Sequence, residues 1–219
     1  VLELRREFGV AAVTALVRIE GRPFGVIANS SQHLGGAIDS DASDKIARFL
    51  GLCDAFGLPI LSLCDTPGFM VGPSAEATGL VRHASRLFVA AASLRVPFFT
   101  VVLRRGYGLG AQAMAAGHFH APVFTISWPS GEFGGMGIEG AARLALRKQL
   151  EALPDEAARE QLVQQAVAYQ TERGKAISMA SYLEIDGVID PADTRAWILR
   201  GLRACPPAER RERRFIDTW

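Results

Sequence analysis

Short apolar runs alternate with helical segments along most of this chain. The runs LPILSLC, PFFTVVL and PVFTISW are almost continuously apolar, and the segments between them place apolar residues at the spacing of one helix face. Buried strands joined by helices predict a mostly parallel sheet that is covered on both faces. Such sheets place their sites at the carboxyl ends of the strands, so the loops that follow the strands are where function is expected.

The predicted elements follow one another without a linker or an internal repeat. Strands at 10–19 and 23–29 form a hairpin through Glu20-Gly21-Arg22; then come a helix behind Ser40 and Asp41, a strand at 58–64, a helix at 74–94, a strand at 97–103, a glycine-rich loop with a short alanine-rich helix from about Gly110, and a strand at 122–128. Amphipathic helices are predicted at 137–150 and 155–174, and residues 184–202 predict a short strand, a proline turn and a helix capped by Asp193. We therefore expect one α/β domain over residues 1–219.

Composition narrows the class of protein further. The 219 residues are 49% hydrophobic and 21% charged with a formal net charge of +1, which suits one compact domain and gives no field to attract nucleic acid or anionic membrane. Arg95 and Pro97 interrupt the longest apolar region, so no membrane span is predicted. The basic run at 209–215 is interpreted as a solvated end.

The cysteines and the first residue suggest where the chain comes from. Cys53, Cys64 and Cys205 form no CxxC pair and follow no signal peptide, which predicts free, mostly buried thiols and a bacterial cytoplasmic protein. The sequence opens on Val1, so we expect it to be a piece of a longer subunit.

Two loops leave the carboxyl ends of predicted strands. In RRGYGLGAQAM, Gly106, Gly108 and Gly110 precede a helix start whose unsatisfied N–H groups can hold an oxyanion. In CDTPGFMVG, Pro67-Gly68 suits a type II turn, with Asp65 able to accept from nearby amides. Each loop also has a purely structural interpretation, as a turn, and both interpretations stay open here.

Side chains with their own chemistry are few. There is no GxSxG elbow, and His118 and His120 have no acidic or thiol neighbour, so we expect no metal site. Glu132 and Glu139 could form a carboxylate pair for proton transfer, although Glu139 lies where a helix start favours an acid. This scarcity suggests catalysis by backbone dipoles that act on a cofactor.

Several separated motifs carry a family resemblance. GRPFGVIANS, HLGGAIDSDASDKIARFLGLCDAFGLPILSLCDTPGFMVG, RRGYGLGAQAM, WPSGEFGGMGIEGA and EIDGVIDPADTR occur in this order. Nearly the whole chain thereby resembles the C-terminal half of the carboxyltransferase subunit of biotin-dependent acyl-CoA carboxylases, the propionyl-CoA and methylcrotonyl-CoA type. The resemblance implies a crotonase-like α/β fold, a ββα superhelix with a mostly parallel sheet and C-terminal helices, and an N-terminal half that is absent from this sequence.

The resemblance also implies a reaction, in which carboxybiotin releases carbon dioxide, the biotin enolate takes the α-proton of an acyl-CoA, and the thioester enolate attacks the carbon dioxide. The base is then the cofactor. The family's Gly-Gly-Ala run falls on residues 108–110, so the amides of Leu109 and Gly110 are expected to hold the biotin oxygen. The remaining expected contacts are Gly108, Asp65, Thr66, Pro67, Gly68 and Phe69 for the cofactor, and Gln112, Met136 and Gly137 for the acyl substrate.

The expected partners are a biotin carboxyl carrier domain, biotin carboxylase, the N-terminal half and further copies in a trimer or hexamer, and the chain alone is expected to be inactive. Leu109 stands where the family has glycine, which requires a negative φ there. GEFGGMG differs from the AEIAVMG run of propionyl and acetyl members, so the acyl group stays open. Two other functions also stay open: an enoyl-CoA hydratase or isomerase that uses Glu132 and Glu139, and a non-catalytic assembly module.

Overall fold

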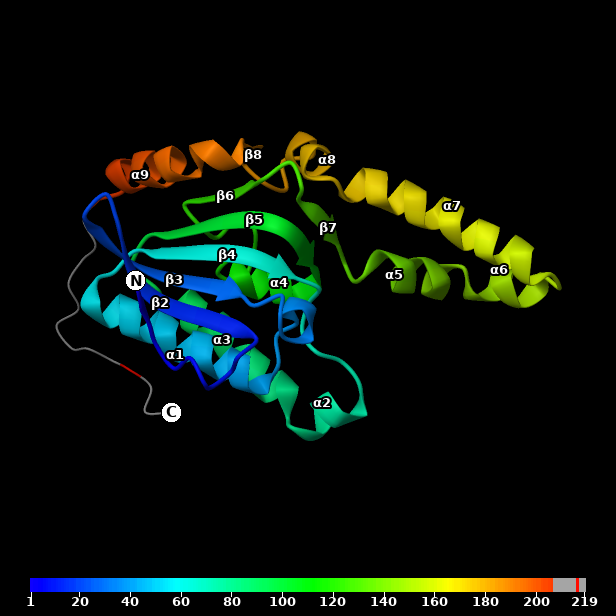
Figure 1. Ribbon diagram of the computed structural model, residues 1–219, viewed down its shortest axis with the longest axis horizontal. Coiled ribbons are helices and arrows are strands. Elements are labelled where there is room, and N and C mark those ends of the chain that lie inside the picture. Colours follow the sequence, from blue (N-terminus) through cyan, green and yellow to red (C-terminus); the bar gives the residue numbers. More distant parts are fainter. Residues whose placement is uncertain (207–215, 217–219) are drawn as a thin grey trace.

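A twisted sheet forms the centre of the computed structural model, which describes residues 1–206 and residue 216 (Figure 1). Within these residues the strand order is β1-β2-β3-β4-β5-β6-β8, and β7 pairs with the end of β5. The strands are β1 (Leu2–Glu3), β2 (Ala12–Ile19), β3 (Arg22–Asn29), β4 (Ile60–Thr66), β5 (Phe98–Tyr107), β6 (Phe124–Ser127), β7 (Glu132–Gly134) and β8 (Gly187–Val188). Only the β1–β2 and β2–β3 pairs are antiparallel, so the predicted hairpin and the mostly parallel α/β sheet are confirmed.

Helices cover both faces of this sheet. They are η1 (Leu34–Gly36), α1 (Ser40–Phe56), α2 (Pro73–Ala77), α3 (Leu80–Ala92), α4 (Gly108–Met114), α5 (Ile138–Ala145), α6 (Arg147–Ala152), α7 (Glu156–Gly174), α8 (Ala176–Ser181), η2 (Pro191–Asp193) and α9 (Thr194–Ala204). In Figure 1, α1, α3 and α4 lie on one face of the sheet and α9 lies on the other. None of the helices in the described part of the chain combines the length and apolar character of a membrane span.

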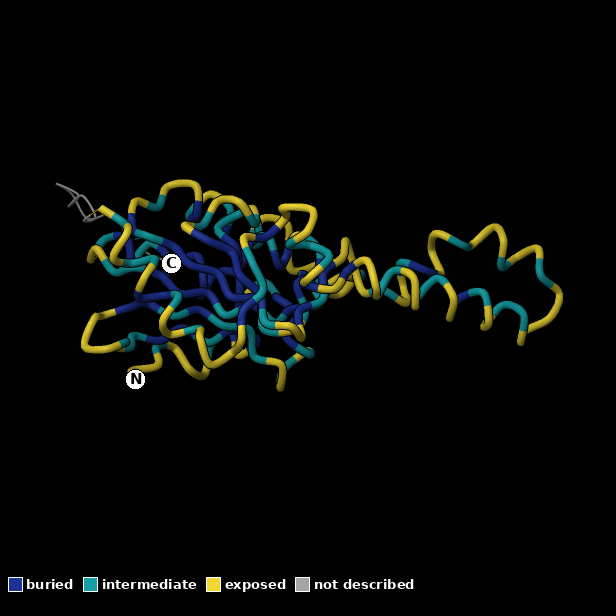
Figure 2. Tube along the Cα trace, turned by 90° about the horizontal axis from the view of Figure 1, so that it is seen from above, coloured by how far each residue is buried: buried dark blue, intermediate teal, exposed yellow. Residues whose placement is uncertain are grey.

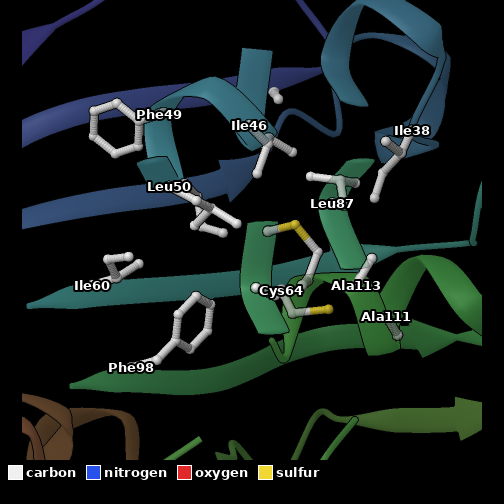
Figure 3. Packing of buried hydrophobic residues seen from close by; sticks show 14 of the residues in the cluster. Ile38, Ile46, Phe49, Leu50, Ile60, Cys64, Leu87, Phe98, Ala111 and Ala113 are labelled. Atoms are coloured by element: carbon white, nitrogen blue, oxygen red, sulfur yellow. The ribbon is translucent and has the colours of Figure 1, made fainter. Parts of the chain in front are cut away.

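Two apolar clusters separate the layers. On the first face, Ile46 and Leu50 of α1 and Leu87 of α3 pack over Ile60 and other strand residues (Figure 3). On the second face an aromatic row crosses the sheet to α9: the ring centroids of Phe99 and Phe124 are 5.0 Å apart, and those of Phe124 and Trp197 are 5.9 Å apart. Successive strand residues therefore enter opposite cores, which explains why the strands are continuously apolar.

A helical arm projects from one end of the sheet. Helices α5, α6 and α7 (residues 138–174) extend away from the body, and most of their surface is exposed (Figure 2). Helix α7 packs on α5, and its fully buried residues are Val163 and Gly174. The arm leaves the sheet after β7 and returns to it at α8.

The predicted helix boundaries need correction at several places. The helix expected at 74–94 is two helices, because Gly79 adopts a left-handed conformation (φ 73°) that ends α2 and begins α3. The helix expected at 137–150 is likewise divided between α5 and α6 at Leu146. At Gly79 the helix stops because glycine reaches positive φ at little cost, whereas Leu146 keeps a negative φ (−93°).

Of the two predicted helix caps, the one at α1 was wrong by one residue and the one at α9 is in place. The N-cap of α1 is Asp39, whose carboxylate accepts from the Ala42 amide at 2.8 Å, and not Ser40 or Asp41. At the last helix Asp193 is the N-cap of α9, as predicted, although its side chain makes no cap hydrogen bond. Asp190 caps the preceding η2, where its carboxylate accepts from the Ala192 amide at 2.8 Å. Both Asp39 and Asp190 have the extended backbone that suits a capping side chain.

Other predictions concern the cysteines and the basic run. Cys53 and Cys64 are buried free thiols and Cys205 is partly exposed, as predicted. Burial, aided by a neighbouring aspartate, raises the pKa of both buried thiols to about 12, so they are unreactive near neutral pH. The basic run at 209–215 lies outside the described residues.

Candidate active site

The two loops singled out in the sequence meet at the carboxyl edge of the sheet. A Cβ built on Gly110 would lie 2.7 Å from the Cα and carbonyl carbon of Gly68, so the start of α4 packs directly on the turn that follows β4. Within that turn the Thr66 hydroxyl accepts from the Gly68 amide at 3.1 Å, and Gly68 has a φ of 120°. The contact is between backbones, and no side chain at residue 110 could fill the space without moving the turn.

The helix begins earlier than predicted. Gly106 and Tyr107 are the last residues of β5, and α4 starts at Gly108, not near Gly110. Gly108 has a φ of 59°, and a Cβ there would lie 2.8 Å from the Gly135 carbonyl oxygen. A Cβ on Gly106 would lie 3.2 Å from the Phe133 ring. Close packing therefore accounts for each of these glycines, in agreement with the interpretation of the loop as a structural turn.

The amides of Leu109 and Gly110 lie in the first turn of α4. Helix geometry gives amides at these positions no intrahelical acceptor, and no side chain of the described residues caps α4. Leu109 is not among the residues with positive φ, so leucine can stand here, where the family has glycine, without backbone strain. Its side chain is 62% exposed and contributes little to the core. The helix start thus presents two donors near the turn of residues 66–69.

Asp65 is held by two arginines. Arg104 Nη2 donates to its Oδ2 at 2.9 Å, and Arg105 donates to its Oδ1 from Nε and from the backbone amide, both at 3.2 Å. Burial alone would raise the pKa of Asp65, but the hydrogen bonds from Arg104 and Arg105 outweigh it and hold that pKa below its ordinary value. The carboxylate is therefore ionised and already engaged at neutral pH.

Glu132 and Glu139, considered above as a carboxylate pair for proton transfer, bind to different partners. Tyr107 donates to Glu132 Oε2 at 2.9 Å, and burial together with this carboxylate raises the pKa of Tyr107 to about 12. Glu139 lies on the arm with a side chain that is 68% exposed, where Arg143 donates to it at 3.2 Å. Neither glutamate lines the cavity next to α4.

That cavity has a volume of about 590 Å³ and opens between the end of β5 and the base of the arm. Of the three residues expected to bind the acyl substrate, Gln112 and Met136 line this cavity, and Gly137 lies between two lining residues without lining it itself. Sequence reasoning missed most of its walls. The missed residues are Phe119, Phe133, Ile138, Ala141, Tyr169, Gln170, Arg173, Met179 and Glu184.

The histidine pair lies at this cavity too. His118 lines it, and the rings of His118 and His120 meet edge to face with centroids 5.0 Å apart. His120 Nε2 lies 2.9 Å from the Leu183 carbonyl oxygen. Among the described residues, no three histidine, cysteine or acidic side chains lie close enough together to hold a metal.

A mostly parallel sheet thus carries a glycine-lined helix start at its carboxyl edge, packed against the turn that follows β4. The sequence profile of the carboxyl transferase domain matches residues 1–215, and the chain belongs to this family. It is 38% identical over 202 residues to the methylmalonyl-CoA carboxyltransferase 12S subunit of Propionibacterium freudenreichii subsp. shermanii, covering 92% of this chain and 38% of that protein. It is 36% identical to the propionyl-CoA carboxylase carboxyltransferase subunit of Haloferax mediterranei, covering 91% of this chain and 38% of the relative.

Solved structures of similar fold agree with membership of this family. A single-chain, multi-domain long-chain acyl-CoA carboxylase matches with a TM-score of 0.82 and 56% identity, covering 91% of this chain and 19% of the other. The transcarboxylase 12S hexamer, with methylmalonyl-CoA and methylmalonic acid bound, matches with a TM-score of 0.82 and 34% identity, covering 97% of this chain and 41% of the other. The expected crotonase-like α/β fold is confirmed, and the chain spans well under half the length of these relatives.

Proposed function

We propose that this chain forms the half of a carboxyltransferase that holds biotin, and that the complete protein transfers a carboxyl group from carboxybiotin to the α-carbon of an acyl-CoA. The observation that carries the proposal is the pair of uncapped amides, Leu109 and Gly110, at the point where α4 packs on the turn of residues 66–69. Residues 1–219 are then the C-terminal domain of a longer assembly.

The residues present fit the ureido oxygen of biotin. When bound, carboxybiotin supplies the carboxyl group and leaves negative charge on that oxygen. The amides of Leu109 and Gly110 would bind the oxygen, with Gly108 and the backbone of residues 65–69 lining its approach. Fixed donors stabilise a developing charge without reorganising, and deleting one such donor costs about 10²–10³ in rate. This explains why the loop needs no acid or base.

The acyl group would lie in the 590 Å³ cavity, against Gln112, Met136 and the backbone near Gly137. Phe119, Phe133 and Met179 give the cavity apolar wall for a hydrocarbon, and its volume leaves room for more than a two- or three-carbon group. The structural relative with 56% identity is described as a long-chain acyl-CoA carboxylase. We therefore propose a long-chain acyl-CoA as the substrate.

The two other functions receive less support. A hydratase or isomerase would need Glu132 and Glu139 at one substrate, but Glu132 accepts from Tyr107 and Glu139 pairs with Arg143 on the arm. Neither carboxylate lines the cavity. An assembly module would need neither the cavity nor the uncapped helix start.

The proposed partners follow from this function. They are an N-terminal carboxyltransferase half that holds the thioester oxygen, a biotin carboxyl carrier domain, biotin carboxylase, and further copies of the chain in a trimer or hexamer. The relative with bound methylmalonyl-CoA is described as a hexamer. A reducing cytoplasm suits the buried free thiols of Cys53 and Cys64.

The test uses the full-length protein with its carrier domain, biotin carboxylase, ATP and labelled bicarbonate. We expect label to enter the acyl-CoA, faster with a long acyl chain than with propionyl-CoA, and only when the carrier is biotinylated. Turnover of enoyl-CoA without biotin would establish the hydratase or isomerase instead. No turnover of either kind would leave the assembly module.

A further inference from the structure

We propose that Asp65 is a positioning residue that sets the first turn of α4 through Arg105. This inference rests on the proposed function, because it assumes that the amides of Leu109 and Gly110 do the binding. In this proposal the Asp65 carboxylate acts on the neighbouring strand β5 and not on a ligand.

The position of Asp65 in the sheet is unusual. Cys64 pairs with Val102 and Thr66 pairs with Gly106, so one residue of β4, Asp65, stands opposite three residues of β5. At the same place β5 changes its other neighbour. It pairs with β6 through Val102 and with β7 from Arg105 onward. The strand is therefore re-aimed between Val102 and Arg105, a few residues before α4 begins.

The Asp65 carboxylate replaces the missing ladder contact at this bulge. Its Oδ1 accepts from the Arg105 backbone amide at 3.2 Å and from Arg105 Nε at 3.2 Å. The same guanidinium donates through Nη2 to the Gly35 carbonyl of η1. The Asp65 amide in turn donates to Asn29 Oδ1 at 3.1 Å. Asp65 thus joins the ends of three strands and the η1 loop at one point.

Burial distinguishes the two arginines. The Arg105 side chain is 25% exposed, whereas that of Arg104 is 54% exposed, so water and salt screen the Arg104 pair much more. Arg105 also contributes the backbone amide, and only Tyr107 and Gly106 separate it from α4. We therefore assign the positioning effect to the contact between Asp65 and Arg105.

The backbone around the start of α4 is too closely packed to absorb a change at the bulge. A Cβ on Gly108 would meet the Gly135 oxygen at 2.8 Å, and one on Gly110 would meet Gly68 at 2.7 Å. The start of α4 is thus confined between two backbones, and a shift of β5 at Arg105 must move it relative to the turn of residues 66–69. A misplacement of about 1 Å at a reacting centre can cost about 10²-fold in rate.

The test compares Asp65→Ala and Asp65→Asn in the full-length protein. For Asp65→Ala we expect kcat for carboxyl transfer to fall about 10²-fold with the KM for acyl-CoA within about twofold. Hydrogen exchange of the backbone in residues 103–112 should become faster, a readout that does not need turnover. Asp65→Asn keeps a neutral acceptor for the Arg105 amide, so it should restore most of the rate and the protection.

Asp54 offers a matched control. Like Asp65, it accepts from the backbone amide of an arginine, in this case Arg95 at 2.6 Å near the amino end of β5, and it is buried whereas Asp65 is partly buried. Asp54→Ala should lower the melting temperature yet leave kcat within about twofold. A similar fall in kcat for both alanine variants at a similar loss of stability would overturn the proposal, since destabilisation alone would then explain it.

If Asp65→Ala does not fold, Asp65→Ser, whose shorter side chain withdraws the acceptor from Arg105, forms a cycle with Arg105→Met and the double variant. We expect the double variant to be no slower than the slower single variant, because the two side chains act as one unit; additive losses would overturn the proposal. An Asp65→Ala protein within threefold of the unmodified protein, with unchanged exchange, would also overturn it. Absence of carboxyl transfer in the unmodified protein would instead contradict the proposed function.

Discussion

Replacing the amide of Leu109 by an ester tests the oxyanion donors directly. Incorporating the α-hydroxy acid counterpart of leucine exchanges the N–H for an oxygen and keeps the side chain. Leu109 is a better choice than Gly110, because a Cβ at Gly110, as in Gly110→Pro, would lie 2.7 Å from the Gly68 backbone and confuse the result with a displaced turn. The exchange removes one donor and adds no atom to the packed interface.

The ester exchange should affect folding stability and the rate of carboxyl transfer to different extents. The Leu109 amide has no intrahelical acceptor, so folding loses only strength at the Gly108 carbonyl, which becomes an ester carbonyl, at a cost of about 0.5–1.5 kcal/mol. Loss of one oxyanion donor costs about 2.7–4 kcal/mol of transition-state stabilisation, or about 10²–10³ in kcat. The rate should therefore fall far more than the stability.

The assay is carboxyl transfer from carboxybiotin by the full-length protein, with melting temperature and oligomer size measured on the same samples. Leu109→Ala is the control for the side chain, which is 62% exposed, and it should retain the rate within about threefold. An ester protein that also stays within threefold would show that the Leu109 amide does not hold the charged oxygen, and the reasoning from the helix start would fail.

Three further predictions concern other parts of the chain. Glu132→Gln should leave the rate of carboxyl transfer within a few-fold and lower the pKa of Tyr107, now about 12, because the carboxylate that raises it is gone. A difference titration against Tyr107→Phe measures this pKa. A rate loss of about 10²–10⁴ would favour the hydratase or isomerase. Gln112→Trp should narrow the 590 Å³ cavity and lower kcat/KM for a long-chain acyl-CoA at least about tenfold while sparing propionyl-CoA. Equal losses for both substrates would argue against an acyl site there. Lys45 is buried, with its Nζ donating to the Ala12 carbonyl at 2.6 Å, and burial lowers its pKa. Between that lowered pKa and the ordinary lysine value near 10.4, the unfolded chain therefore binds more protons than the folded chain. Stability relative to Lys45→Met should therefore rise with pH across this window, which paired thermal melts at increasing pH would show, and a constant difference would contradict it.

Elements that depend on local pattern could be predicted from the sequence. The strands and the main helices follow from apolar spacing, and the family's motifs located both loops of the site. The break at Gly79 was missed because an isolated glycine inside an apolar helical pattern does not say whether the helix continues. The start of α4 was placed two residues late for a similar reason, since three glycines suggested a loop where β5 continues.

Features that depend on long-range contacts could not be predicted. At the bulge beside Asp65, Arg105, 40 residues later in the chain, donates from its amide and its guanidinium to the Asp65 carboxylate. The cavity has walls from Phe119, Phe133 and α7, which meet only after the arm folds back. No signal within any one of these segments indicates the others, because the spacing between them is set by tertiary packing.

Both ends of the arm are attached to the same short strand. Gly135 follows β7 directly, and on the return Lys175 bridges to Glu132, while a Cβ on Gly174 would lie 2.3 Å from the Phe133 oxygen. The segment between these anchors supplies much of the cavity wall, whereas the amides of α4 belong to the sheet. Under the proposed function, remodelling this one segment would change the shape of the acyl cavity and leave the amides of α4 in place.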